Sequence, residues 1–326
     1  MPPLSPIVET HRPTSIPPSL LSLLYSKPYF PCSLPVLRRI QFAEKFADRG
    51  GCTSHSRVVH VYHHPGARDP DRFVTGYVDL SKGPETQVWL FCSLEIQSGG
   101  EEGRVWDGLL LRFFQVAEGL WEGERKKKIL VGSIHEMVRK RMINLGMGLE
   151  KTALAGGQEW EFDYKFVFRV GDLPELEGGM SDKRWEVEGR EFYWDEIRKG
   201  DVRLVKSRTA IDRQEMCRAT LLMVPSLAVR LGATGEAVGW GFLGLDGTLM
   251  SLHVEEPYRR LGFGKAIAIK LMRERLHEYG DDGLGAADVW VENTKSQGLC
   301  RAIGGKPSWI VSWGILDLES MQNIKL

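Results

Sequence analysis

The apolar residues of this chain follow two different periods. Runs rich in β-branched and aromatic residues and bounded by Gly, Pro or Asp are typical of strands, whereas apolar residues three and four positions apart are typical of amphipathic helices. Strands are predicted at residues 58–62, 77–80, 87–92, 160–170, 202–211, 226–230, 237–244, 248–254 and 289–291. Helices are predicted at residues 105–120, 129–147, 212–222, 264–278 and 294–303. This mixture predicts an α/β (α+β) fold.

Two segments interrupt these patterns and suggest domain boundaries. Residues 1–33 are rich in proline and serine, and we expect them to form a disordered tail. Residues 172–190 are charged, rich in glycine and poor in β-branched residues, which is typical of a linker. The sequence therefore predicts an N-terminal α/β domain at residues 34–171 and a second domain at residues 191–326.

The composition narrows the classes of partner and compartment. Lys plus Arg number 43 and Asp plus Glu also number 43, so no global charge favours nucleic acid or an anionic membrane. No stretch approaches the length of an apolar membrane span. The five cysteines are scattered and none has metal-site spacing, which predicts a reducing compartment and no bound metal. We expect a cytoplasmic location, with a mitochondrial one as the alternative because the N-terminal segment has low acidity.

A strand, a turn with glycines and a helix follow one another in residues 248–278. The turn reads Arg259-Arg260-Leu261-Gly262-Phe263-Gly264 and is followed by Lys265. A helix start leaves four backbone N–H groups without partners and carries partial positive charge, and glycines allow a bulky group to approach. The stretch predicts a pyrophosphate cradle built mostly from main-chain amides. The alternative is a strand-to-helix turn in which the glycines serve only close packing.

A second strand–helix unit lies downstream, and its helix follows Asn293 and ends at Gly304-Gly305. Together the two units resemble the GNAT superfamily of N-acetyltransferases. The coenzyme motif of that family, Q/R-x-x-G-x-G/A, is carried here by Arg259, Gly262 and Gly264. Its next motif, N-x-x-A-x-x-L-Y-x-x-x-G-F, has Asn293, Ser296, Leu299, Cys300, Gly304 and Gly305 at the corresponding positions. Pro225-Ser226, Val238-x-Trp240 and Asp246-Gly247 further resemble the glycine N-acyltransferase branch and its fungal relatives, over about residues 202–317.

The resemblance implies a GNAT fold, which is a mixed twisted sheet flanked by helices, with an N-terminal half that is a degenerate copy of the second. It also implies acetyl-CoA or another acyl-CoA as co-substrate. By resemblance, the backbone of Leu252, His253 and Val254 pairs with the pantetheine amides, and one N–H there polarises the thioester. The amides of residues 260–265 would hold the pyrophosphate. Asn293, with Ser296 nearby, would bind the pantetheine arm or fix the loop.

The groups that move protons depart from the family pattern. Many relatives carry a glutamate base eleven residues before the arginine of the turn, where this chain has Thr248, and a tyrosine acid where it has Cys300. The candidates for the base are Asp246, His253 and Glu255, and His253 has the most suitable ordinary pKa. Simple alternation along the strand places His253 on the face opposite Thr248. Deprotonation relayed by water is the alternative, and a packed Cys300 is the alternative to an acid.

The sequence therefore predicts an N-acyltransferase that moves an acyl group, acetyl first, from coenzyme A to a small amine or amino acid. Two alternatives stay open. One is a catalytically silent acyl-CoA-binding module, favoured by Thr248 and Cys300, and the other is a protein N-acetyltransferase. Neither nucleic acid nor a membrane is expected as a partner, and the sequence does not indicate an oligomeric state.

Overall fold

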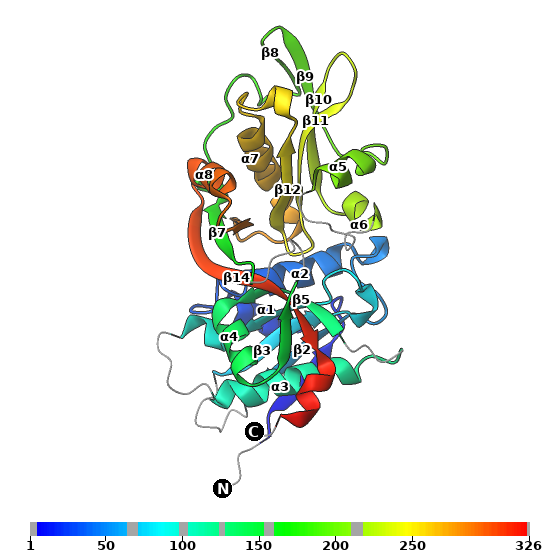
Figure 1. Cartoon of the computed structure of the whole chain (residues 1–326), viewed down its shortest axis with the longest axis vertical. Coiled ribbons are helices and arrows are strands. Elements are labelled where there is room, and N and C mark those ends of the chain that lie inside the picture. Colours follow the sequence, from blue (N-terminus) through cyan, green and yellow to red (C-terminus); the bar gives the residue numbers. More distant parts are fainter. Residues whose placement is uncertain are drawn as a thin grey trace. The chain divides into compact units, whose positions relative to one another are not determined.

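The computed structural model describes residues 5–63, 71–97, 104–123, 128–152, 160–209 and 218–324. The chain divides into two compact units (Figure 1). Unit 1 comprises residues 1–161 and 310–326, and unit 2 comprises residues 162–309. The second unit thus begins at Phe162 and not at residue 191, because the strand that follows residue 162 pairs within unit 2.

Unit 1 is a mixed sheet with helices on it. In chain order its elements are β1 (Ile7–His11), α1 (Pro18–Tyr25), α2 (Leu34–Lys45), β2 (Arg57–Tyr62), β3 (Phe73–Val78), β4 (Val88–Cys92), α3 (Arg104–Gly119), β5 (Lys128–His135), α4 (Glu136–Asn144) and β6 (Gly148–Lys151). Strands β1 to β4 are antiparallel neighbours, and β5 lies parallel to β4. The C-terminal part of β14 (Lys306–Asp317) pairs with both β5 and β6.

The core of unit 1 lies mainly under α3. Val74 and Val78 of β3 are buried in this core, and a Cβ on Gly76 between them would lie 2.4 Å from the ring of Phe113. The glycine therefore lets α3 approach the sheet closely. Residues of β14 and of the turn after it, including Leu316, complete the same core.

Unit 2 repeats this plan. In chain order its elements are β7 (Asp163–Arg169), β8 (Arg184–Val187), β9 (Arg190–Asp195), α5 (Val202–Arg208), α6 (Arg218–Met223), β10 (Ser226–Leu231), β11 (Ala237–Leu243), β12 (Thr248–Val254), α7 (Phe263–Arg275), β13 (Leu284–Trp290) and α8 (Thr294–Ala302). The strand order is β8-β9-β10-β11-β12-β13-β7, and only the β12–β13 pair is parallel. Helix α7 lies against β10, β11 and β12 (Figure 1).

The described elements of the two units follow the same order. The series β1-α1-α2-β2-β3-β4-α3-β5-α4 of unit 1 matches β9-α5-α6-β10-β11-β12-α7-β13-α8 of unit 2. In both series the one parallel pair joins the two strands that flank the central helix, namely β4–β5 and β12–β13. The expected α/β fold, with a first half that repeats the second, is therefore confirmed in its architecture.

Several local expectations were wrong. The segment expected to be a disordered tail carries β1, which pairs with β2, and α1, which buries Leu20 and Leu24. The expected linker contains β8, which forms a hairpin with β9. Both segments contain short runs of strand or helix formers, namely IVETH in β1, LLSLL in α1 and RWEV in β8, within a composition otherwise rich in proline, serine or glycine.

Two element types were also wrong. The helix predicted at residues 129–147 is a strand followed by a helix, β5 and α4, and His135 Nδ1 accepts a hydrogen bond from Met137 N at the junction. The strand predicted at residues 202–211 is helix α5, which buries Val202 and Val205 one turn apart. Short apolar runs fit either period, so packing decided both.

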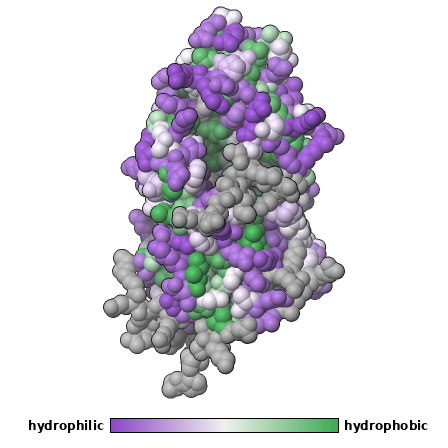
Figure 2. Space-filling model, in the orientation of Figure 1, coloured by the Kyte–Doolittle hydropathy of each residue, from purple (hydrophilic) through white to green (hydrophobic). Residues whose placement is uncertain are grey.

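The face of unit 2 shown in Figure 2 is mainly hydrophilic, and apolar side chains gather there only in small groups. The exposed large apolar side chains among the described residues are Ile143, Leu222 and Trp290. No helix in the described ranges is both long enough and apolar enough to cross a bilayer.

Candidate functional site

Strands β12 and β13 of unit 2 pair for only two residues and then separate. The parallel ladder joins Thr248 to Ala286 and Leu249 to Ala287, and it ends there. Beyond this point no strand in the described part of the chain pairs with the β13-facing edge of residues 252–254. An open strand edge offers backbone donors and acceptors to an extended ligand.

A β-bulge interrupts β12 inside this opening. Trp240 of β11 pairs with His253 and Phe242 pairs with Met250, so three steps on β12 match two on β11. Ser251, in the bulge, has a left-handed φ of 51°. The extra residue resets the alternation of side chains along the strand.

The bulge corrects the expected position of His253. A Cβ on Gly239 or Gly241 would contact Ile267 of α7, so Trp240 between them lies on the opposite face together with its partner His253. Leu249 contacts the Gly241 position on the α7 side, which puts Thr248 on the opposite face as well. His253 and Thr248 therefore share one face, and the expectation from simple alternation was wrong.

The turn between β12 and α7 presents main-chain amides. Arg260 and Gly262 have left-handed φ angles of 69° and 85°, and the φ of Leu261 between them is not positive. Such alternation makes successive N–H groups converge on one concave site. Among the described residues, no side chain accepts a hydrogen bond from the amides of residues 261–265 at the start of α7.

The two motif glycines have different roles. Gly262 supplies the left-handed N-cap of α7, and a Cβ there would lie 3.3 Å from Met180 Cε. A Cβ on Gly264 would lie 3.2 Å from Leu299 Cδ1 of α8. Gly264 therefore allows α7 to pack closely on α8, while the left-handed turn itself favours glycine at position 262.

The other residues of the predicted cradle divide into exposed and buried side chains. Arg259, Arg260 and Lys265 are exposed, and Arg259 Nε donates to Val254 O at 3.0 Å, which ties the turn to the end of β12. Leu261 is half-buried. Phe263 is buried against Phe192 of β9, with ring centroids 4.8 Å apart, so it offers only its backbone to a ligand.

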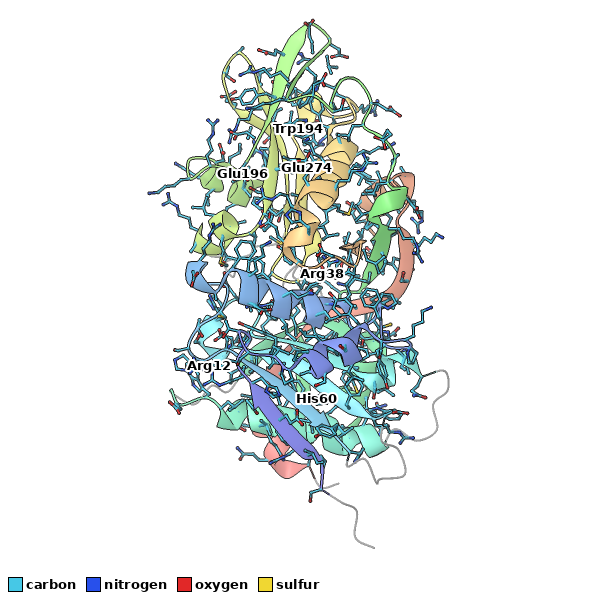
Figure 3. The ribbon with its side chains drawn as sticks, turned by 180° about the vertical axis from the view of Figure 1, so that it is seen from behind. Arg12, Arg38, His60, Trp194, Glu196 and Glu274 are labelled. Atoms are coloured by element: carbon cyan, nitrogen blue, oxygen red, sulfur yellow. The ribbon has the colours of Figure 1, made fainter. Side chains whose placement is uncertain are left out.

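The segment that was expected to be a linker belongs to this site. Met180 contacts the Gly262 position, and its carbonyl accepts from Trp194 Nε1 at 2.8 Å. Trp194 lies beside α7 in Figure 3, with Lys270 Nζ 5.7 Å from its ring centroid. Residues near position 180 therefore pack beside the start of α7, which the composition did not indicate.

His253 and Glu255 lie close together on the face opposite α7. His253 Nε2 is 3.7 Å from Glu255 Oε1, and Arg208 Nε of α5 donates to the same oxygen at 2.9 Å. The His253 ring stacks on Trp240 with centroids 4.7 Å apart. Burial lowers the pKa of His253 below 6.5, because the nearby Glu255 charge only partly offsets it. The imidazole is thus neutral, and able to accept a proton, at neutral pH.

Asp246 has a structural partner. Its side chain is 8% exposed, and Oδ1 accepts a hydrogen bond from Thr248 N at 3.2 Å in the β11–β12 hairpin. This contact closes the turn at Gly247, whose φ is 70°. The geometry favours a turn-stabilising role for Asp246.

Two further predicted residues, the N-cap of α8 and a cysteine within this helix, have structural roles. Asn293 Oδ1 accepts from Ser296 N at 3.0 Å and so caps α8, as expected if the asparagine fixes the loop. Cys300 is 3% exposed, and burial raises the pKa of its thiol to about 11. A buried thiol with so high a pKa favours packing over proton donation.

A charged pair that no sequence pattern indicated lies at the same site. Lys165 Nζ of β7 lies 2.8 Å from Asp288 Oδ1 of β13, and the two residues are separated by 123 positions in the chain. The same Nζ lies 3.5 Å from Thr248 Oγ1. Only the pairing of β7 with β13 brings these groups together.

Unit 1 lacks the bulge in the corresponding strand. Its parallel pair β4–β5 also joins only two residues, but the β3–β4 ladder runs without a register shift. The left-handed residue lies instead on β5, at Ser133 with a φ of 50°. The loop at residues 98–103, where the counterpart of the cradle would lie, falls outside the described residues.

Comparisons with known proteins agree with this arrangement. A Drosophila protein of known structure is 17% identical and superposes with a TM-score of 0.61 over 95% of this chain and 98% of its own. A tandem GNAT protein from the clavulanic acid biosynthesis pathway is 10% identical, with a TM-score of 0.52 over 96% of this chain and 99% of its own. The chain has a GNAT fold.

Family models match parts of both units. Residues 5–160 match the model of the acyl-CoA N-acyltransferase verG N-terminal domain, and residues 226–313 match the FR47-like protein model. No curated protein matches the sequence. The two family matches and the GNAT fold support an acyl-CoA-dependent N-acyltransferase activity in general.

Proposed function

We propose that unit 2 transfers an acyl group from acyl-CoA to a primary amine. The observation that carries the proposal is the bulged, open edge of β12, which leads directly into the uncapped amides at the start of α7. These features offer an extended polar edge followed by an anion cradle, and pantetheine and pyrophosphate follow one another in coenzyme A in the same way.

The proposed binding mode assigns a role to each part of the edge. The backbone of Leu252, His253 and Val254 pairs with the pantetheine arm, and an N–H beside the bulge donates to the thioester carbonyl as negative charge develops. The amides of residues 260–265 hold the pyrophosphate. Arg260 and Lys265 add exposed positive charge near it.

We assign proton acceptance to His253. The neutral imidazole lies on the face that carries Thr248, and Glu255 stabilises the imidazolium that forms. Asp246 and Cys300 are weaker candidates, since Asp246 closes a hairpin and Cys300 is buried. The acceptor amine would reach the thioester from the face opposite α7.

The acceptor class follows from the resemblance to the glycine N-acyltransferase branch. It suggests a small amine or an amino acid, with acetyl as the first acyl group to test. A catalytically silent acyl-CoA-binding module is the second candidate, because no carboxylate stands at Thr248 and the Cys300 thiol is buried.

The cradle is tested with Gly262→Glu. The variant places a side chain at a left-handed position and a negative charge beside the pyrophosphate, so affinity for coenzyme A should fall by about 100-fold or more, two charge-assisted contacts of about 1.5–3 kcal/mol each being lost. Calorimetry with coenzyme A measures the change. Gly283→Glu is the control, since Gly283 has a similar φ of 69° and open space around it. Equal affinity in Gly262→Glu and the wild type would contradict the cradle.

Thiol release from acetyl-CoA with a panel of amines distinguishes the two candidate functions. An enzyme releases thiol in proportion to acylated amine. Binding of acetyl-CoA without turnover by any amine would favour the silent module.

A further inference from the structure

A buried ion pair lies at the vertex where β12 and β13 separate. Lys165 and Asp288 are direct partners across β7 and β13, and Nζ lies 2.8 Å from Oδ1 and 2.9 Å from Oδ2. The Lys165 side chain is fully buried and that of Asp288 is 8% exposed. Because Ala287 is the last residue of β13 that pairs with β12, Asp288 is the first residue beyond the vertex.

The Lys165 ammonium group also contacts β12, the other strand at this vertex. Lys165 Nζ is 3.5 Å from Thr248 Oγ1 of β12, on the sheet face opposite α7. A lysine from β7 thus contacts polar groups of both diverging strands. We call the side chains of Lys165, Asp288 and Thr248 together the polar end wall.

The direction of the coenzyme brings its acyl end to this wall. This step rests on the proposed function, in which pyrophosphate lies at Gly262 and pantetheine runs back along β12 from Val254 toward the bulge. The acyl group then points from the bulge toward the vertex. Met250 and Asp288 are each the first residue beyond the last β12–β13 pair. The ladder with β11 places His253 two β11 steps from Met250, which is roughly 7 Å at about 3.3–3.4 Å per step.

We propose that the polar end wall restricts transfer to short acyl groups, with acetyl preferred. An acetyl or propionyl group ends before the wall and leaves its contacts intact. A longer alkyl chain would have to pack against this buried charge pair and would offer it no hydrogen-bond partner, which is costly. The pair would therefore select the acyl donor without touching the amine.

The test is the acyl-chain profile of the full-length protein. Rates with acetyl-, butyryl-, hexanoyl- and octanoyl-CoA are measured with one accepted amine, and dissociation constants are measured in parallel by calorimetry. Wild type should prefer acetyl to octanoyl by about 100-fold, since a single methylene in a fitted pocket changes specificity by roughly 10–200-fold. Octanoyl transfer or binding as good as acetyl in the wild type would overturn the proposal.

A double variant, Lys165→Met with Asp288→Leu, should relax the preference. Replacing both partners by apolar residues avoids a lone buried charge and is usually tolerated. The acetyl-to-octanoyl ratio should fall at least about tenfold through a gain with octanoyl-CoA, as expected from the removal of a polar wall. The matched control is Lys128→Met with Glu150→Leu, an exposed pair in unit 1 with side chains 51% and 57% exposed. Equal ratios in variant and control would overturn the proposal.

Two further measurements keep the test decisive. If circular dichroism shows that the double variant does not fold, Thr248→Val removes one polar atom of the wall and should shift the ratio in the same direction by a smaller factor. An unchanged acetyl-to-octanoyl ratio in Thr248→Val would then contradict the proposal. Should acyl-CoA bind without turnover, the proposed function fails, while the ratio of dissociation constants still decides the inference.

Discussion

At the scale of single residues, Ser251 determines which side chains meet at the site. Its left-handed backbone, with a φ of 51°, inserts one residue into β12 and turns His253 to the face of Thr248. A non-glycine residue in this region is uncommon and strained, and such residues gather at functional sites. No local sequence signal predicts a bulge at Ser251, so simple alternation assigned His253 to the wrong face of the strand.

The role of His253 leads to a prediction about pH. Burial lowers the pKa of His253 below 6.5, so kcat/KM should be constant at neutral pH and fall as the pH decreases through that lowered pKa. His253→Gln should reduce kcat by roughly 10²–10⁴-fold and remove this acidic limb. Initial rates between pH 5 and 9 measure both effects.

Glu255→Gln serves as the companion variant. Loss of the carboxylate removes the charge that raises the pKa of His253, so the acidic limb should move to lower pH. If His253→Gln instead has wild-type rates and the same decrease in kcat/KM at low pH, deprotonation through water is favoured.

At the scale of elements, two helix starts in unit 2 are built differently. Helix α8 is capped by Asn293 Oδ1, which accepts from Ser296 N, whereas the N-cap of α7 is Gly262, which has no side chain to offer. A helix start needs acceptors for its first amides. Of these two helices, α7 is the one whose first-turn amides have no side-chain cap and are available to an anion.

Asn293→Ala should therefore affect stability more than binding. Loss of an N-cap side chain costs about 0.5–2 kcal/mol, which urea unfolding would detect as a lower free energy of unfolding. Asn293→Ser should restore most of the loss because serine is also a good cap. A tenfold weaker affinity for acetyl-CoA at unchanged stability would show that the asparagine contacts the coenzyme instead.

Elements with strong local signals were predicted well from the sequence. Strand β12 has the predicted bounds, and α7 and α8 follow the glycine turn and Asn293 as expected. The helix predicted at residues 129–147 failed because Ile129–Val131 fit a strand as well as a helix, and the parallel pairing with β4 decided between them. The Lys165–Asp288 pair could not be predicted, because it depends on which strand adds beside β13.

At the scale of the whole molecule, the strands that complete the two units come from unexpected parts of the chain. Strand β7, which follows β6 of unit 1 in the chain, pairs with β13 of unit 2. Strand β14, which follows α8 of unit 2, pairs with β5 of unit 1. Leu316 of β14 and Leu318 just after it are nearly fully buried in the core of unit 1. The stability of unit 1 therefore depends on residues after 309.

A chain that ends at Trp309 should lose the fold of unit 1. Removal of β14 exposes the edges of β5 and β6 and removes Leu316, Leu318 and Met321 from the core, and each lost apolar side chain typically costs 2–5 kcal/mol. Limited proteolysis with mass spectrometry should show rapid cleavage within residues 5–152. A chain that ends at Ile324 is the control, and equal protection of both chains would contradict the assignment.

The late position of β14 has a consequence for biosynthesis. Most of unit 1 leaves the ribosome first, yet its sheet lacks a strand until residues 310–317 have been translated. Unit 2 has all the strands from β7 to β13 before that point, so we expect the half made second to mature first. During this interval the exposed edge of β5 is the part of the nascent chain most in need of a chaperone.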